Sequence, residues 1–182
     1  MKPLVVLESI SSEGVRKMNS KTDVKLMEFA SPEAAFQKYA DTVYRLAFVR
    51  TKNKADSDDI LQDVFLRYMK VWEKMESEEH VKAILLRITV NCSNSLKTSS
   101  WFKKTESLNE NLIITDNYED GDLLAEVLKL PQKYRTAIHL FYYCGYSVNE
   151  IADIEKINPS TVKTHLNRAR SILKKTIKAE DL

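Results

Sequence analysis

Apolar residues recur every three or four positions in several stretches of the chain, and this spacing predicts amphipathic α-helices. The first stretch opens on Ser31-Pro32-Glu33, where an N-cap residue is followed by a proline and an acid in the first turn. A helix is expected from there to about Arg50. Its buried stripe is predicted to contain Phe36, Tyr39, Val43, Leu46 and Ala47.

Two more helices are expected at short intervals. The second runs from the acid-rich segment Asp56–Asp59 to about Lys74, and the third from a cap at Ser77 to about Leu96. Three helices with short connections can share one core. Residues 31–104 are therefore predicted to form one helical domain.

Two segments lack helical periodicity. Residues 1–30 contain scattered serines and one glycine, and are expected to form a flexible leader. Residues 105–122 are expected to form a flexible acidic linker, because 105–121 hold no Lys or Arg. The acids that define this linker are Glu106, Glu110, Asp116, Glu119 and Asp120.

Periodicity returns at Leu123, so residues 123–182 are predicted to form a second helical domain. Gly145 is placed for a left-handed helix C-cap, and Ser147 with Glu150 makes an S-x-x-E capping box that begins a short helix. The stripe before Gly145 is predicted to contain Tyr134, Ala137, Ile138, Phe141 and Tyr142. The stripe of the last helix, which opens at Pro159, is predicted to contain Val162, Leu166, Ala169 and Leu173.

Composition excludes several kinds of enzyme. The 182 residues include only 3 Gly, too dispersed for a phosphate-binding glycine loop. Cys92, Cys144 and the three histidines have no metal-binding or disulfide spacing, so no metal, cofactor or catalytic residue is predicted. No apolar run suggests a membrane span or a signal peptide, and a cytoplasmic protein is expected.

The end of the chain has the pattern of a helix-turn-helix. Two helices are joined by a tight turn, and the second opens at Asn158-Pro159. From Lys156 to Ala179 there are seven basic residues and no acid, which favours binding to phosphates. An ordinary amphipathic helix with a solvated basic face is the alternative interpretation. At about 100° per residue, the face opposite Val162 holds Ser160, Thr164, Asn167, Arg168 and Ser171.

These residues resemble a known family. The segments Leu130–Arg135, Phe141–Ala152 and Ser160–Arg170 look like the fourth domain of extracytoplasmic-function (ECF) sigma factors. Independently, Asp58–Arg67 is similar to the helix of sigma domain two that docks on the polymerase clamp, and Leu86–Asn91 to the segment that melts and reads the minus-ten element. Two motif sets in the expected order are more specific than either alone.

The resemblance implies an all-α fold, with sigma domain two and a helix-turn-helix sigma domain four joined by the linker. It implies an alternative sigma factor that binds core RNA polymerase, directs it to specific promoters and helps open them. The implied partners are core polymerase, promoter DNA as duplex and as melted single strand, and an anti-sigma factor as a further candidate. No small-molecule substrate and no catalysis are implied.

Matched positions give three sets of candidate residues. Those for duplex minus-thirty-five DNA are Ser160, Lys163, Thr164, His165, Asn167 and Arg168. Those for the minus-ten strand are Arg87, Asn91 and Ser95. Those for polymerase are Asp59, Gln62, Asp63, Phe65 and Leu66.

Three positions depart from the family pattern. Ile84 stands where Trp is usual, and Cys144 stands where an acid is frequent, either as a redox thiol or as a buried inert one. His165 replaces the usual Arg, so promoter binding through it is expected to be tighter at pH 6 than at pH 8.

Other functions are open at this point. A conventional helix-turn-helix repressor or activator would bind duplex DNA without polymerase, but it leaves the motifs of the first domain unexplained. A sigma-like chain that titrates polymerase or a regulator without initiating is a second alternative. The acidic linker either threads the polymerase along the nucleic-acid path or is a solvated tether.

Overall fold

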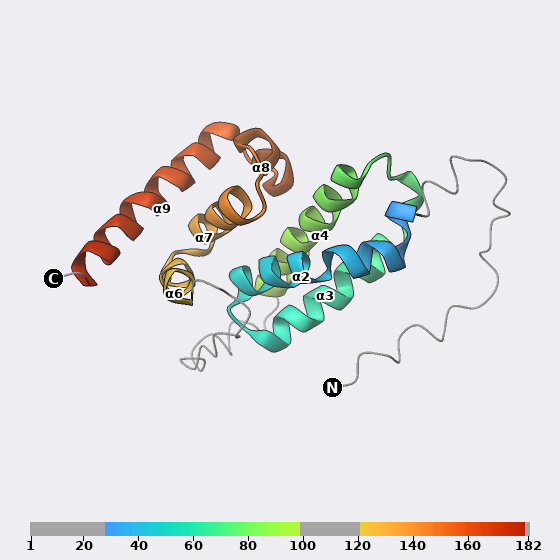
Figure 1. The fold of residues 1–182 in the computed structure, drawn as a ribbon, viewed down its shortest axis with the longest axis horizontal. Helices are drawn as coiled ribbons and strands as arrows, with labels where there is room; N and C mark the ends of the chain where they lie inside the picture. The colour runs from blue at the N-terminus through green and yellow to red at the C-terminus, as the bar shows by residue number, and fades with distance from the viewer. Residues whose placement is uncertain (1–27, 99–120, 181–182) are drawn as a thin grey trace, which may run out of the picture.

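The computed structural model describes residues 28–98 and 121–180, which form two groups of helices side by side (Figure 1). The first group, the N-terminal bundle, contains α2 (Pro32–Thr51), α3 (Lys54–Tyr68), the 3₁₀ turn η1 (Trp72–Lys74) and α4 (Glu78–Thr98). The second, the C-terminal unit, contains α6 (Gly121–Lys129), α7 (Gln132–Ile138), the π-helical segment η2 (His139–Tyr143), α8 (Val148–Glu155) and α9 (Pro159–Glu180). No strand occurs within the described residues, and the expected all-α class is confirmed.

Caps fix where the helices of the N-terminal bundle begin. Ser31 Oγ accepts a hydrogen bond from the Ala34 backbone N–H at 3.2 Å, and Ser77 Oγ accepts one from the His80 N–H at 3.2 Å, both as predicted. Helix α3 begins earlier than expected, because the Asn53 side chain caps it. Its predicted extension to Lys74 is wrong, since the chain tightens into i→i+3 turns after Tyr68.

The N-terminal bundle has its own apolar core, built mainly from Tyr39, Val43, Ile60, Val64, Tyr68 and Leu85. Phe36, predicted to be buried, is 48% exposed and packs edge-on against the Phe65 ring at 4.9 Å between centroids. The predicted leader, 1–30, lies mostly outside the described residues. At its end the chain is already ordered: residues 28–30 are helical, and the Tyr68 hydroxyl donates to the buried Ala30 carbonyl at 2.7 Å.

Helix α6 begins at Gly121, inside the predicted linker 105–122, whose earlier residues lie outside the described part of the chain. Leu123, where the helical periodicity returns, is exposed, whereas Leu124 and Leu128 are buried. These two leucines pack on Phe48 and Val49 from the end of α2. The first helix of the C-terminal unit is therefore seated on the N-terminal bundle.

The segment η2 changes the helical register of the C-terminal unit. The Cys144 N–H donates to the His139 carbonyl at 3.1 Å, an i→i+5 bond. Each residue of a π-turn rotates by less than 100°, so Tyr142 leaves the predicted buried stripe and is 56% exposed. Gly145 follows with φ 77°, the expected left-handed cap. The predicted capping box between Ser147 and Glu150 is also present.

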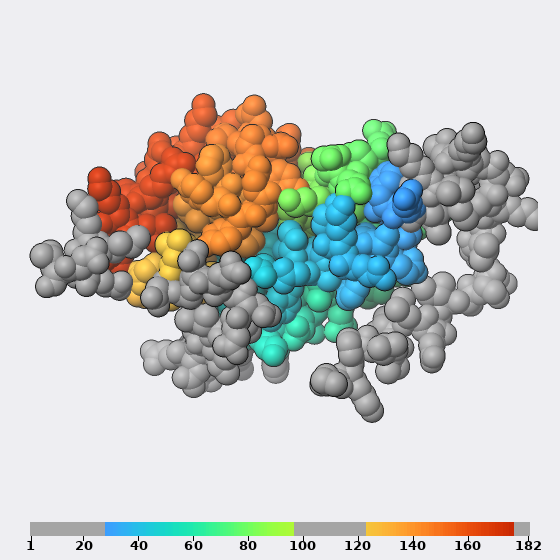
Figure 2. All heavy atoms as spheres, in the orientation of Figure 1, coloured from blue at the N-terminus to red at the C-terminus, as the bar shows by residue number. Residues whose placement is uncertain are grey.

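The core of the C-terminal unit is shared with the N-terminal bundle. Its buried residues include Leu140, Ile151, Val162, Leu166 and Ala169. The same cluster contains Leu46 from α2 and both Leu86 and Val90 from α4. In Figure 2 the orange atoms of α7 and η2 lie directly against the green and cyan atoms of the bundle. The two groups of helices thus share this core, while the N-terminal bundle keeps a separate one.

Candidate nucleic-acid and polymerase interface

Helices α8 and α9 form a helix-turn-helix. The three residues between them, 156–158, make the turn, and Lys156 adopts the left-handed conformation with φ 57°. The Ile157 N–H returns to the Ala152 carbonyl at 3.0 Å, and the Val162 N–H donates to the Asn158 carbonyl at 3.2 Å. A turn of this length holds the second helix at the angle needed for a DNA groove.

One side of α9 is exposed and basic. Val162, Leu166 and Ala169 are buried beneath it, as the periodicity predicts. The exposed side is called the reading face below and comprises Ser160, Lys163, Thr164, Asn167 and Arg168. His165, the remaining candidate for duplex DNA, is half-buried at its edge.

Tyr134, from α7, organises the edge of the reading face. Its hydroxyl accepts a hydrogen bond from Arg168 Nη1 at 3.3 Å, and its ring meets the His165 ring edge-on at 5.6 Å between centroids. Lys133 Nζ lies 5.2 Å from the centroid of the same ring. Sequence reasoning placed Tyr134 in a buried stripe and missed these contacts. Only the aromatic character of position 134 could have suggested them.

His165 contributes less charge than its sequence position suggests. Burial is the main cause that lowers its pKa, and the nearby positive charges of Lys133 and Arg168 lower it further. A histidine with a lowered pKa gains its proton only at a more acidic pH. The gain in affinity expected between pH 8 and pH 6 therefore moves toward lower pH.

The candidates for the minus-ten strand lie along α4 at intervals of four residues, and each has different surroundings. Asn91 is exposed. Ser95 donates to the Asn91 carbonyl at 3.1 Å and lies beside α3. Arg87 is half-buried and donates to the Asp153 carbonyl of α8 at 2.9 Å. In this conformation the guanidinium of Arg87 is engaged by the C-terminal unit.

Four of the five polymerase candidates meet in a shallow groove of about 290 Å³ between α3 and α4, called the docking groove below. They are Asp59, Gln62, Asp63 and Leu66, and they are joined there by Ile60, Arg67, Cys92, Ser95 and Leu96. Leu66 is 49% exposed, as a surface for a protein partner requires. The fifth candidate, Phe65, is only 8% exposed, and its ring packs between those of Phe36 and Tyr68. Phe65 therefore belongs to the core of the N-terminal bundle and not to the groove.

The positions that depart from the family pattern have ordinary structural surroundings. Ile84 is half-buried against the core of the N-terminal bundle. Burial raises the pKa of the Cys144 thiol to about 11 and also raises that of Cys92. Thiols with raised pKa values are poor nucleophiles, which favours the inert interpretation of both cysteines.

Among the residues that the structure describes, no three or more His, Cys, Asp and Glu side chains gather in a group that could hold a metal ion. Within the same residues, no helix is both long enough and apolar enough to span a membrane.

A helix-turn-helix whose second helix carries an exposed basic face is typical of the class of DNA-binding transcription proteins. Comparison with known families is more specific. The family "Sigma-70 region 2" matches residues 35–102, and "Sigma-70, region 4" matches residues 120–173. The chain belongs to the ECF sigma factors, which act in promoter-specific initiation of transcription and are regulatory proteins.

Individual relatives agree with this assignment. The chain is 31% identical over 145 residues to the RNA polymerase sigma factor SigV of Bacillus subtilis, covering 76% of this chain and 86% of SigV. It is 28% identical over 159 residues to the ECF sigma factor SigW of the same organism, covering 77% and 85%. The fold is similar to that of the sigma factor RpoE from Bartonella quintana, which was solved in complex with the anti-sigma factor NepR. The TM-score is 0.64 and the sequence identity is 20%, and the match covers 80% of this chain and 96% of the RpoE chain.

Proposed function

We propose that this sigma factor divides its work among three surfaces: the docking groove for core polymerase, α4 for the melted minus-ten strand, and the reading face of α9 for duplex minus-thirty-five DNA. The observation that carries this proposal is the exposed, acid-free face of α9 on a helix-turn-helix, in one chain with the groove on α3. The protein acts without catalysis of its own, in the cytoplasm, where core polymerase and DNA meet.

Chemistry assigns different roles along the reading face. Asn167 and Arg168 can each make paired hydrogen bonds to a base edge in the major groove. Ser160, Lys163 and Thr164 suit phosphate oxygens, which fix the position of the helix without specifying sequence. The hydrogen bond that Arg168 donates to the Tyr134 hydroxyl supports this division, because it limits the directions that the guanidinium can take.

The minus-ten strand calls for a different surface. Unpaired bases are recognised by stacking and by polar groups that meet their edges. The exposed Asn91 amide is suited to such an edge, and Arg87 is suited to the backbone once it is released from Asp153. The simpler alternative is that Asn91 is an ordinary polar residue that faces solvent and does not contact DNA.

The proposed domains are 31–104 and 123–182, preceded by the leader and joined by the acidic linker. An anti-sigma factor is proposed as a further partner, supported by the solved RpoE complex, whose chain has a similar fold. The docking groove, with its exposed leucine and flanking carboxylates, is the surface that we assign to core polymerase.

Replacing Arg168 by alanine tests the reading face. If Arg168 reads a base, holoenzyme carrying Arg168→Ala is expected to bind its own promoters about 5- to 150-fold more weakly, with little change on a scrambled minus-thirty-five element. The matched control is Lys174→Ala, an exposed basic position further along α9 and outside the reading face.

The promoters are identified by sequencing transcripts after induced expression. Competition binding on these promoters then measures the affinity of both variants. Lys174→Ala is expected to weaken all sequences by a similar small factor, as loss of one positive charge does. Equal weakening of specific and scrambled promoters by Arg168→Ala would assign that residue to phosphate contact and contradict its role in base recognition.

A further inference from the structure

Two tyrosines of the α7–η2 segment are linked to the residues of the reading face that can specify a base. Tyr134 accepts the hydrogen bond from Arg168 described above. Tyr142 is linked to Asn167 through Arg170, which donates from Nε to the Tyr142 hydroxyl at 2.9 Å and from Nη1 to Asn167 Oδ1 at 3.4 Å. The series Tyr142–Arg170–Asn167 is called the relay below.

Aromatic rings of η2 hold the Arg170 guanidinium in place. Its Cζ lies 5.7 Å from the centroid of the Phe141 ring and 5.7 Å from that of the Tyr142 ring. The two rings meet edge-on at 5.0 Å between centroids, so each supports the other. A guanidinium that packs on rings and is also hydrogen-bonded loses much of the freedom of an exposed side chain. Arg170 is therefore an oriented donor beside Asn167, although it is exposed.

The π-turn in η2 makes the relay possible. Regular steps of about 100° would keep Tyr142 in the buried stripe of α7. Because the turn is wider, Tyr142 is 56% exposed and its hydroxyl meets Arg170 of α9. Single π-turns within helices frequently occur at functional sites. Here the turn brings a hydroxyl acceptor to the edge of the reading face.

The polarity of the bond between Arg170 and Asn167 is fixed by chemistry. A guanidinium can only donate, so the atom of Asn167 that faces it is the amide oxygen. Arg170 lies three positions further along α9, so this bond draws the oxygen along the helix surface. The amide nitrogen, on the other side of the same carbon, remains the group that can meet a base.

This orientation changes which base Asn167 can read. Adenine presents an acceptor and a donor side by side in the major groove, and asparagine matches them only when its oxygen and nitrogen both face that base. An amide oxygen can accept two hydrogen bonds, but one turned toward Arg170 does not lie with the nitrogen on one base edge. Guanine presents N7 and O6 and thymine presents O4, all acceptors that suit a donating amide.

We propose that Tyr142 and Arg170 are positioning residues that determine specificity. They hold Asn167 as a hydrogen-bond donor, so that it selects a base with an acceptor edge, guanine or thymine, over adenine. This inference rests on the proposed function, in which the reading face meets the minus-thirty-five duplex. Neither positioning residue has to touch a base itself.

The experiment measures base preference directly. Holoenzyme made from core polymerase and the full-length chain is mixed with promoter DNA randomised over the minus-thirty-five element, and the bound DNA is sequenced. The base pair that Asn167 reads is the one whose preference is lost in Asn167→Ala. At that base pair the wild-type protein is expected to favour guanine or thymine over adenine.

Two variants break the relay to different extents. Arg170→Met keeps a long side chain but removes its donors, so the preference for adenine relative to guanine at this base pair is expected to rise about fivefold or more. Tyr142→Phe keeps the ring beside Arg170 and removes only the hydroxyl, so a smaller shift in the same direction is expected.

Matched controls separate the relay from general effects of charge and of a lost hydroxyl. Lys174→Met removes a positive charge from an exposed position of α9 outside the reading face. Tyr143→Phe removes a hydroxyl from the next residue of η2, whose ring stacks on His139 instead. Both controls are expected to leave the base preference unchanged.

Heteronuclear NMR of the free full-length chain tests the relay without DNA. The side-chain amide signal of Asn167, identified by its absence in Asn167→Ala, is expected to move in Arg170→Met and in Tyr142→Phe but in neither control. A signal that stays in place in Arg170→Met rules out the relay and with it the proposal.

Three binding results also overturn the proposal: an unchanged base preference in Arg170→Met, a wild-type preference for adenine at the base pair that Asn167 reads, or no base pair altered by Asn167→Ala. If the wild-type holoenzyme enriches no minus-thirty-five sequence at all, the proposed function fails and the base assignment fails with it. The amide signal then still decides whether Tyr142 and Arg170 orient Asn167.

Discussion

Replacing Arg135 by methionine is expected to lower the free energy of unfolding by about 3–5 kcal/mol, as loss of a buried, fully engaged charged group typically does. The guanidinium is buried and donates to three carbonyls, those of Val49, Arg50 and Leu130. Methionine fills similar space but donates no hydrogen bond, so three buried oxygens lose their partner. Urea denaturation followed by circular dichroism measures the change.

Arg170→Met is the matched control for this prediction. Arg170 is exposed and packs on Tyr142, so its loss is expected to change the free energy of unfolding by less than about 1 kcal/mol. If Arg135→Met costs no more than this control, the hydrogen bonds from Arg135 to the carbonyls at the end of α2 do not stabilise the fold.

Truncation of Leu46 to alanine is expected to cost about 2–5 kcal/mol in the free energy of unfolding. Leu46 belongs to α2 but is fully buried in the core cluster of the C-terminal unit, so the cavity opens at the shared interface. Thermal and urea unfolding of the full-length protein measure this loss of free energy of unfolding.

The control is Leu66→Ala, the same truncation on an exposed position of α3. It is expected to leave the free energy of unfolding within about 0.5 kcal/mol while weakening binding to core polymerase through the docking groove. A large loss of stability at Leu66, or none at Leu46, would contradict the assignment of one to the groove and the other to the shared core.

Much of the fold follows from local rules in the sequence. Ser31, Ser77 and Ser147 begin helices because a short side chain with an oxygen satisfies free N–H groups within a few residues. Gly145 ends a helix because it adopts positive φ without strain. Apart from Phe36, which is exposed, and Leu173, which is half-buried, the predicted stripes of α2 and α9 are buried, because both helices keep a regular turn.

Local rules fail where tertiary contacts decide. The π-turn in η2 shifts Tyr142 out of its predicted stripe, and no spacing of residues signals that change in advance. Phe36 stays exposed because it lies on the outer side of the Phe65 ring. The end of α3 was misplaced because the apolar pattern continues through Trp72 although the helix does not.

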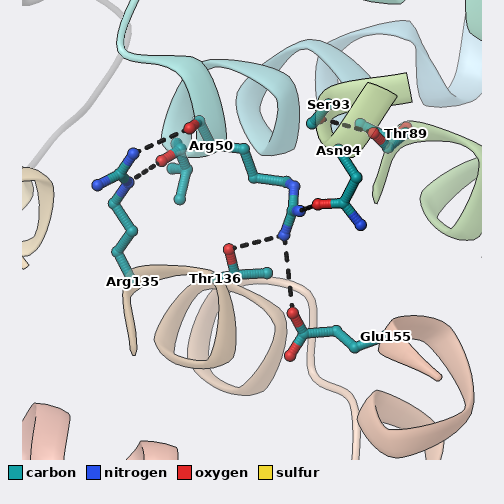
Figure 3. Close-up of polar contacts among 8 residues, drawn as sticks. Arg50, Thr89, Ser93, Asn94, Arg135, Thr136 and Glu155 are labelled. Atoms are coloured by element: carbon teal, nitrogen blue, oxygen red, sulfur yellow. Dashed lines mark hydrogen bonds and ion pairs between the residues drawn. The ribbon is translucent and has the colours of Figure 1, made fainter. Parts of the chain in front are cut away.

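The candidate site also has some features that local rules predict and others that depend on tertiary contacts. The reading face was predicted from the angle to Val162, because residues opposite the buried stripe of an amphipathic surface helix usually face solvent. The burial of Phe65 and the engagement of Arg87 by Asp153 depend on neighbouring helices. Arg50, Arg135 and Glu155 were not singled out, because each is an ordinary charged residue until the fold brings the three together (Figure 3).

Run-off transcription with purified core RNA polymerase and this chain tests the central claim most directly. On promoters identified from induced transcripts, the wild-type protein is expected to give discrete products that core polymerase alone does not make, and Arg168→Ala is expected to reduce them. Duplex DNA binding without any polymerase-dependent transcript would contradict the account and would instead fit a conventional helix-turn-helix regulator.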